Sequence, residues 1–288
     1  MKDVVLLYDE GPSVGLGHRR RIAALARAFR NAGIGTTESA LTHPTSGECV
    51  VVDSYLHRAD DRAWVEGDVI IAVDDIDRDL AVDLVVDPSP GASGAAHIAA
   101  RSVLAGARYA LIGPNLPDIA LRPIVNDVAR VLVTLGGSDY GSLGGAIATA
   151  VASLLPDVEV LLAVGPWSAT PVDELVRTVH VDDGLGPWLA DADIVVTAGG
   201  VTLLEALCLG RPTIVVQIAD NQRQAATSAA SAGAALMVDL APANVADAVQ
   251  RLAHDPQQRR QLASSAARMV DRDGPKRVVE AVLIGSHS

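Results

Sequence analysis

The sequence predicts an α/β protein built from two doubly wound domains, each with a parallel sheet. Short aliphatic runs recur along the 288 residues and alternate with segments of helical periodicity. These runs are hydrophobic at nearly every position, which is typical of strands buried on both faces in a parallel sheet covered by helices. The series occurs twice, so length and pattern both indicate two domains.

The expected strands fall into two sets separated by a break in the pattern. The first set comprises residues 4–8, 49–52, 69–73 and 84–86. Prolines and polar residues at 114–123 then predict a linker, which divides the chain into domains 1–124 and 125–288. The second set comprises residues 131–135, 158–164, 194–197, 213–217 and 235–238.

Composition excludes several classes of protein. A formal net charge of −12 argues against general affinity for nucleic acid or anionic membranes, although Arg19, Arg20 and Arg21 could form a local basic pocket. No apolar run approaches the roughly 20 residues that span a bilayer, and the N-terminus lacks a signal-like segment. We therefore expect no membrane insertion and a cytoplasmic location. Cys49 and Cys208 lie in apolar runs, which predicts buried structural thiols.

A glycine-rich turn connects the first expected strand to an amphipathic helix. Gly15 and Gly17 precede His18, and the helix is marked by Ile22, Leu25, Ala26 and Phe29. Glycines let the backbone approach a ligand closely, and the start of a helix offers unpaired N–H groups. His18 at this place could accept a proton near neutral pH.

Three further loops follow strands in the second half of the chain. Ligands of parallel sheets bind beyond the carboxyl ends of the strands, so these loops are candidate binding segments. Gly199, Gly200 and Thr202 could cradle a diphosphate at a helix start, and Glu205 could accept hydrogen bonds from a ribose. The other two loops contain Gly136, Gly137 and Ser138, and Asn221 and Gln222.

The order of motifs resembles one group of sugar-nucleotide proteins. The segment from Asp191 through Ala198-Gly199-Gly200-Val201-Thr202 to Asn221-Gln222 is similar to the nucleotide-binding half of MurG-type GT-B glycosyltransferases. The first half adds motifs that resemble the PseG/SpsG family in the same order: Gly15-Leu16-Gly17-His18, Val52-Asp53-Ser54-Tyr55, Val73-Asp74-Asp75-Ile76, Asp83-Leu84 and Gly106-Ala107-Arg108-Tyr109-Ala110-Leu111. The resemblance extends over nearly the whole chain.

This resemblance implies two Rossmann-like domains facing a cleft, with UDP held mainly by the C-terminal one. It implies that His18 is the general base of a nucleotide-sugar hydrolase, and that Asp53, Tyr55, Asp74 and Asp75 lie on the sugar side together with Gly15 and Gly17. Leu7 and Gly113 stand where the family usually carries arginine, so we expect an altered sugar specificity. The substrate class is a UDP-linked amino or deoxy sugar.

Two other functions remain open from the sequence. The chain could be a GT-B glycosyltransferase that uses a UDP- or dTDP-sugar, because His18 would activate an acceptor hydroxyl as it would water. It could also be a non-catalytic partner that binds a sugar nucleotide. Backbone N–H groups can carry the charge of the leaving diphosphate, so we expect neither a metal nor a cofactor. Asp75-Ile76-Asp77 and Asp191-Ala192-Asp193 are expected to serve as turn and capping residues.

Overall fold

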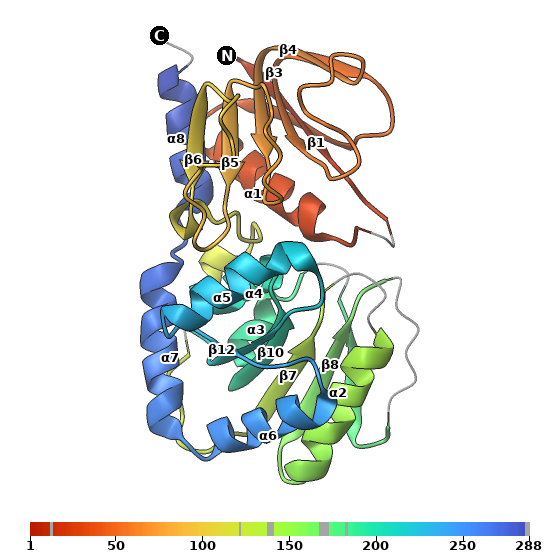
Figure 1. Ribbon diagram of the computed structural model, residues 1–288, viewed down its shortest axis with the longest axis vertical. Coiled ribbons are helices and arrows are strands. Elements are labelled where there is room, and N and C mark those ends of the chain that lie inside the picture. The colour runs from red at the N-terminus through yellow and green to blue at the C-terminus, as the bar shows by residue number, and fades with distance from the viewer. Residues whose placement is uncertain (12–13, 121, 137–140, 167–172, 182–183, 286–288) are drawn as a thin grey trace. The chain divides into compact units, whose positions relative to one another are not determined.

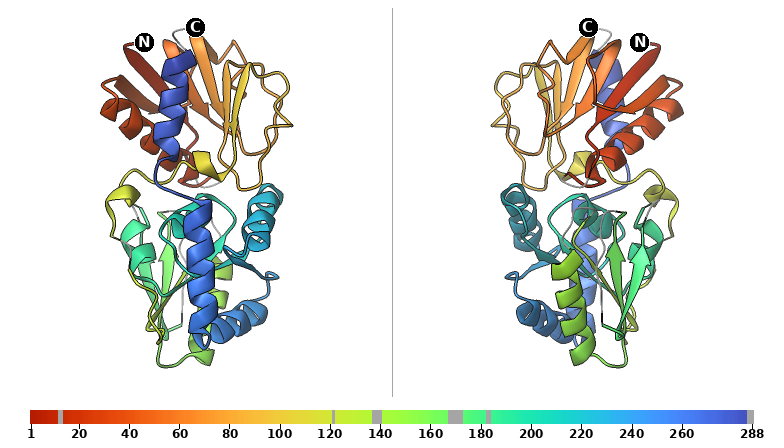
Figure 2. Two further views of the ribbon diagram at one scale, coloured as in Figure 1. Left: turned by 90° about the vertical axis from the view of Figure 1, so that its left-hand side faces the viewer. Right: turned by 90° about the vertical axis from the view of Figure 1, so that its right-hand side faces the viewer.

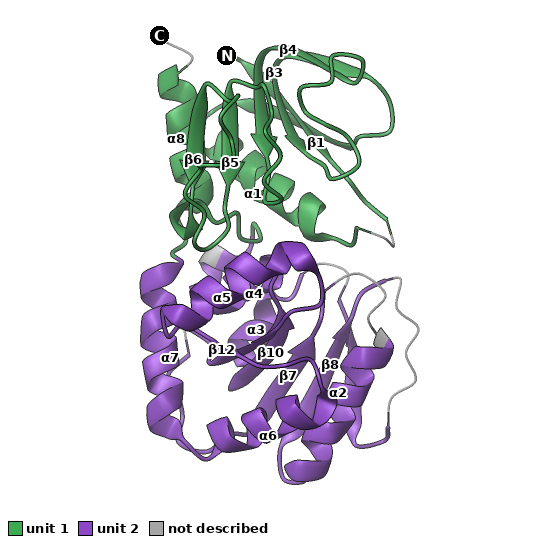
Figure 3. Cartoon of the chain, in the orientation of Figure 1, with its two compact units in different colours: residues 1–114, 271–288 green, residues 115–270 purple. Residues whose placement is uncertain are grey.

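A computed structural model describes residues 1–11, 14–120, 122–136, 141–166, 173–181 and 184–285 (Figure 1). The chain divides into two compact units, unit 1 with residues 1–114 and 271–288 and unit 2 with residues 115–270 (Figure 3). Each unit contains a six-stranded sheet in which every pairing is parallel. The expected α/β fold with two parallel-sheet domains is confirmed.

The sheet of unit 1 has the strand order β2-β1-β3-β4-β5-β6. Its strands are β1 (Asp3–Tyr8), β2 (Gly35–Ala40), β3 (Thr45–Asp53), β4 (Val65–Val73), β5 (Leu84–Asp87) and β6 (Ser102–Ala105). The helical elements are α1 (Gly17–Asn31), α8 (Gly274–Gly285) and the short η1 (Ala107–Tyr109).

The two faces of this sheet are covered differently. Helices α1 and α8 lie on one face of the sheet (Figure 2). On this face Phe29 and Val279 belong to the same buried cluster as Cys49 and Val51. The alternate residues of β3 point to the other face, which is covered by loop residues including Leu41, Ala59, Leu80 and Val82. Both faces are apolar, as the sequence predicts, but loops rather than helices bury the second one.

The sheet of unit 2 has the order β12-β11-β10-β7-β8-β9. Its strands are β7 (Arg130–Thr134), β8 (Glu159–Val164), β9 (Val176–His180), β10 (Ile194–Ala198), β11 (Thr213–Val216) and β12 (Leu236–Met237). The helical elements are η2 (Leu116–Asp118), α2 (Gly141–Leu154), α3 (Gly186–Asp191), α4 (Val201–Cys208), η3 (Asp220–Gln222), α5 (Arg223–Ser231), α6 (Pro242–Ala253) and α7 (Pro256–Met269). Residues of β7, β8, β10 and β11 form the core together with α2 and α6.

The boundaries between the units differ from those expected at residues 124 and 125. Unit 2 begins at Asn115, because Leu116 and Ile119 pack around the position of Gly186 at the start of α3. The final segment returns to unit 1, where Gly274 approaches the backbone of Ala110 so closely that a Cβ would lie 2.2 Å from its carbonyl oxygen. A linear division of the sequence could not show this return of the chain.

Candidate active site

The turn that carries His18 is built by backbone geometry that requires glycine. Gly15 has a φ of +73°, in the left-handed region, and its N–H donates to the carbonyl of Gly11. Helix α1 then begins at Gly17, so His18 stands in its first turn, just beyond the carboxyl end of β1. The expected strand, glycine turn and helix are therefore present.

His18 faces a buried carboxylate from the neighbouring strand. Its Nδ1 lies 2.5 Å from Oδ1 of Asp53, the last residue of β3. His18 is 2% exposed and Asp53 is 0% exposed. Because the carboxylate accepts hydrogen bonds, this contact assigns the ring proton to Nδ1 and leaves Nε2 as the basic atom of the neutral ring. Asp53 thus contacts the histidine, and its expected place on the sugar side stays a prediction.

Arg21 completes the arrangement on the same face of α1, three residues after His18. Its Nε and Nη2 each donate to Asp53 at 2.7 Å, and its Nη1 donates to Asp75 at 2.5 Å. Burial alone would lower the pKa of Arg21, but the charges of Asp53 and Asp75 raise it well above its usual value. Arg21 is therefore a permanent cation that binds two carboxylates together. Sequence reasoning missed this role.

Tyr55 and Asp75 complete a cluster with His18, Arg21 and Asp53. The Tyr55 hydroxyl donates to Asp75 at 2.6 Å, and its ring meets the imidazole of His18 edge-on with centroids 4.3 Å apart. Burial raises the pKa of Asp75, but the charge of Arg21 and the hydrogen bonds from Tyr55 and Arg21 outweigh this effect and lower it overall. Burial and the nearby Asp75 charge raise the pKa of Tyr55, so its hydroxyl remains a donor.

Two further aspartates support the loops around this cluster. Asp9 accepts from the hydroxyl of Ser54 and from the backbone N–H groups of Tyr55 and Leu56. Asp74, expected on the sugar side, is 0% exposed, and its oxygens accept from the backbone N–H and the Nε of Arg78. We therefore assign Asp74 to support of the loop after β4.

The candidate nucleotide loops of unit 2 lie at the carboxyl ends of three adjacent strands, β11, β10 and β7. Gly199 follows β10 and packs against η3, because a Cβ there would lie 2.8 Å from the carbonyl oxygen of Gln222. Gly200 caps α4 and is exposed, and apart from its own chain neighbours no atom of the described residues lies within 4 Å of the position of a Cβ. The backbone at Gly199 is thus packed closely against η3, whereas the space beside Gly200 is open.

The other expected nucleotide residues differ in exposure. Thr202 and Glu205 are 7% and 2% exposed on α4, whereas Asn221 is exposed. Gln222 uses its side-chain oxygen to accept from the N–H of Ile218, so it stabilises its own loop. Gly136 follows β7 with a φ of +101°. Gly137 and Ser138 lie outside the described residues, and the nucleotide roles of the whole set stay predictions.

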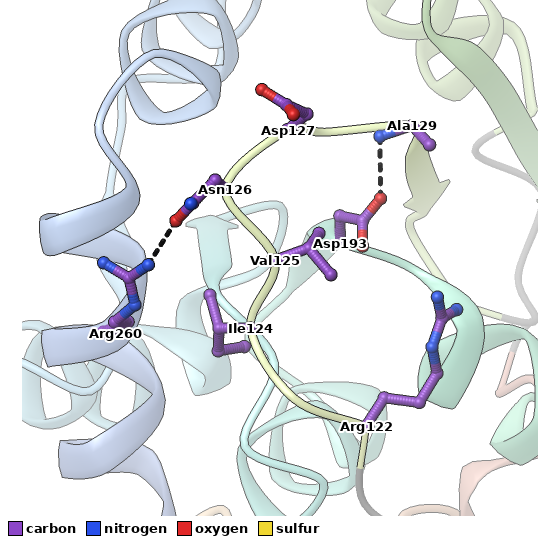
Figure 4. Close-up of a pocket in the computed structure, with 8 residues that line it drawn as sticks. All are labelled: Arg122, Ile124, Val125, Asn126, Asp127, Ala129, Asp193 and Arg260. Carbon is purple, nitrogen blue, oxygen red and sulfur yellow. Dashed lines mark hydrogen bonds between the residues drawn. The ribbon is translucent and has the colours of Figure 1, made fainter.

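A hollow of about 580 Å³ in unit 2 lies at the opposite edge of the sheet (Figure 4). It is lined by Arg122, Asn126 and Arg260, among others, and by Asp193, which directly precedes β10. Asp193 accepts from the backbone N–H groups of Ala129 and Arg130 at the start of β7, which confirms the capping role expected for it. This hollow is separate from the glycine loops.

The fold and the residues at the strand ends define an α/β protein with the two-domain architecture of GT-B enzymes. Residues 131–278 match the glycosyltransferase family 28 C-terminal domain, and the chain belongs to this family. The expected likeness to SpsG and to MurG-type proteins is confirmed by the curated relatives.

Two relatives illustrate the match. Spore coat polysaccharide biosynthesis protein SpsG of Bacillus subtilis (strain 168) is 32% identical over 127 residues, which cover 40% of this chain and 37% of SpsG. The UDP-N-acetylglucosamine--N-acetylmuramyl-(pentapeptide) pyrophosphoryl-undecaprenol N-acetylglucosamine transferase of Mycobacterium avium (strain 104) is 34% identical over 172 residues, 54% of this chain and 42% of that protein. The match thus spans less than half the length of either relative.

Solved structures agree on the fold. Spinosyn forosaminyltransferase SpnP superposes with a TM-score of 0.65 and 16% identity over 100% of both chains. The S. aureus MnaA-UDP co-structure gives a TM-score of 0.65 and 13% identity over 98% of this chain and 96% of that one. In the described ranges, no helix is both long and apolar enough to cross a membrane.

Proposed function

We propose that the chain is a glycosyltransferase that uses a nucleotide sugar, with UDP as the leaving group and His18 as the general base. The observation that carries this proposal is the buried contact between His18 and Asp53, which leaves one basic nitrogen on the imidazole. Membership of glycosyltransferase family 28 and the transferase activity named for the mycobacterial relative favour transfer over the hydrolysis expected from the sequence.

The charge balance of the cluster suits a residue that gains a proton. Arg21 contributes one positive charge and the carboxylates of Asp53 and Asp75 contribute two negative charges, so the cluster carries one net negative charge while His18 is neutral. Uptake of a proton at Nε2 makes the cluster neutral. Asp53 then faces an imidazolium at hydrogen-bond distance, and Tyr55 holds the ring in place.

The same base serves either acceptor. In transfer, His18 takes the proton of an acceptor hydroxyl, whose oxygen forms a bond to the anomeric carbon while the bond to the UDP oxygen breaks. In hydrolysis, water replaces that hydroxyl. Whether transfer or hydrolysis occurs depends on the surface that binds the acceptor. The assay must therefore measure UDP release with and without an added acceptor.

The glycine loop of unit 2 is the proposed site of the diphosphate. The first N–H groups of a helix generally lack intrahelical acceptors, and the positive end of the dipole of α4 lies at its start. In α4 the N–H of Leu203 already donates to the carbonyl of Gly200, so the donors proposed for the diphosphate are those that precede Leu203. Gly200 leaves the space above this backbone open, while Gly199 packs against the η3 loop and fixes it. Donors that are fixed in advance can stabilise the charge of the leaving diphosphate.

Release of nucleoside diphosphate from a panel of UDP- and dTDP-sugars tests the proposal. We expect UDP release that depends on an added acceptor, and we expect His18→Asn to lower turnover about 100-fold or more while UDP affinity changes only a few-fold. His43→Asn, at an exposed histidine of unit 1, is the matched control and should leave turnover unchanged. Full activity of His18→Asn would refute its role as the base. Release without an acceptor would establish a hydrolase, and UDP binding without turnover a binding protein.

A further inference from the structure

Three segments of unit 1 bring potential metal ligands together near the carboxyl ends of β4 and β5. Asp77 lies in the loop after β4, Asp87 is the last residue of β5, and His97 lies in the loop between β5 and β6. One ligand atom from each residue lies within 4.8 Å of the other two. Asp87 and His97 are buried, while Asp77 is exposed, so the group is accessible from solvent on one side.

The orientation of His97 shows which of its nitrogens is available. Its Nδ1 lies 3.0 Å from the carbonyl oxygen of Arg78, and a carbonyl can only accept, so Nδ1 carries the proton. In the neutral ring, Nε2 therefore carries a lone pair. His97 is 2% exposed, and among the described residues Nε2 has no hydrogen-bond partner. Histidines that bind metals usually have the other ring N–H fixed by a carbonyl or carboxylate in this way.

The carboxylates complete a set of three ligands. Asp87 accepts the N–H of Ser89 through Oδ1, and its Oδ2 lies 3.6 Å from Nε2 of His97. This distance is too long for a hydrogen bond. It is close to the separation of about 3.4 Å between two ligand atoms of a tetrahedral zinc ion with bonds near 2.1 Å. Asp77 has a φ of +56° and is the one non-glycine residue with positive φ in the described ranges.

We propose that Asp77, Asp87 and His97 bind a divalent transition-metal ion, with Zn²⁺ as the best fit. One imidazole nitrogen and two carboxylate oxygens suit Zn²⁺, whereas Mg²⁺ and Ca²⁺ take oxygen ligands. Three protein ligands leave a fourth position for water. All three proposed ligands belong to unit 1, and the proposal does not depend on the proposed transfer reaction.

This proposal replaces the sequence-based expectation of no metal. That expectation found no paired spacing for His97 and took Asp75 and Asp77 as turn residues, whereas the other two proposed ligands are 10 and 20 residues away from Asp77 along the chain. The metal would hold the loop after β4, because Arg78 accepts from His97 and also donates to Asp74 and to the carbonyl of Ser54. It would therefore stabilise the segments that carry Tyr55 and Asp75.

Calorimetric titration of the metal-free full chain with Zn²⁺ tests the site. We expect one saturable site per chain, and a Co²⁺-loaded sample should show the visible absorption of nitrogen and oxygen ligands. His97→Gln and Asp77→Asn should each weaken Zn²⁺ binding at least about 10-fold, since loss of even an outer partner costs that much. Asp68→Asn, an exposed carboxylate within β4, is the control and should bind like the unaltered chain.

Two ligand variants are used so that the proposal can still be tested if one of them fails to fold. Asp77 is exposed and asparagine tolerates positive φ, so Asp77→Asn should fold even if His97→Gln does not. Equal Zn²⁺ affinity in Asp77→Asn and the unaltered chain would overturn the proposal. Failure of the unaltered chain to bind Zn²⁺ saturably would also overturn it, and His97 and Asp87 would then be only buried neighbours.

Discussion

Replacement of Asp53 by asparagine separates the charge of this residue from its shape. Asp53 accepts three hydrogen bonds, from Nδ1 of His18 and from Nε and Nη2 of Arg21. An asparagine offers one oxygen and one NH₂ group, so at least one of these donors must face another donor. Arg21 keeps Asp75 as a counter-ion, and we therefore expect a loss of about 3 kcal/mol, the low end of the range for breaking a buried ion pair.

The effect on catalysis depends on which amide atom faces His18. If the NH₂ group faces Nδ1, the ring proton must move to Nε2 and the imidazole is no longer a base at that atom. We expect turnover to fall between about 100-fold and 10,000-fold, with UDP affinity changed only a few-fold.

Urea unfolding and UDP release measure the two effects on the same samples. The control is Glu38→Gln, which removes a surface ion pair with Arg30 and should cost at most about 1 kcal/mol. If Asp53→Asn unfolds at the same urea concentration as the unaltered chain, Asp53 does not neutralise a buried Arg21. If Asp53→Asn leaves turnover unchanged, Asp53 does not orient His18.

Three other perturbations test separate parts of the structure. Gly199→Ala should lower the free energy of unfolding by about 1 to 3 kcal/mol, because the new Cβ would meet the backbone of Gln222. Gly200→Ala should leave the melting temperature unchanged and weaken UDP binding, as measured by calorimetry. Burial raises the pKa of Cys49 to about 12, so its thiol should stay unreactive toward a disulfide reagent at pH 8 until denaturant is added; reaction in the native state would contradict its burial. Arg259→Met should lower the unfolding free energy by about 2 to 4 kcal/mol, because Arg259 is 0% exposed and donates to four backbone carbonyls; an unchanged urea midpoint would contradict this.

The interior strands of both sheets were predictable because they are buried on both faces and are therefore apolar at nearly every position. β1, β3, β4 and β5 match the expected strands of the first half, and β7, β8, β10, β11 and β12 match those of the second. The strands that were missed are β2, β6 and β9, and all three lie at sheet edges. An edge strand is paired on one side only and need not be apolar at every position, as in the partly exposed Gly35–Ala40. The edge strand β12 was nevertheless predicted, because Leu236 and Met237 stand in a short apolar run.

Sequence alone predicts the α/β class, the glycine turn before His18, the loops that follow β7, β10 and β11, and the likeness to SpsG and to MurG-type glycosyltransferases. Each of these depends on residues close together in the chain. The three-dimensional fold was needed to show that Asp53 contacts His18, that Arg21 joins Asp53 to Asp75, and that α8 returns to unit 1. Parallel pairing places the carboxyl ends of β1, β3 and β4 side by side, and this brings together charges that are 32 to 54 residues apart in sequence.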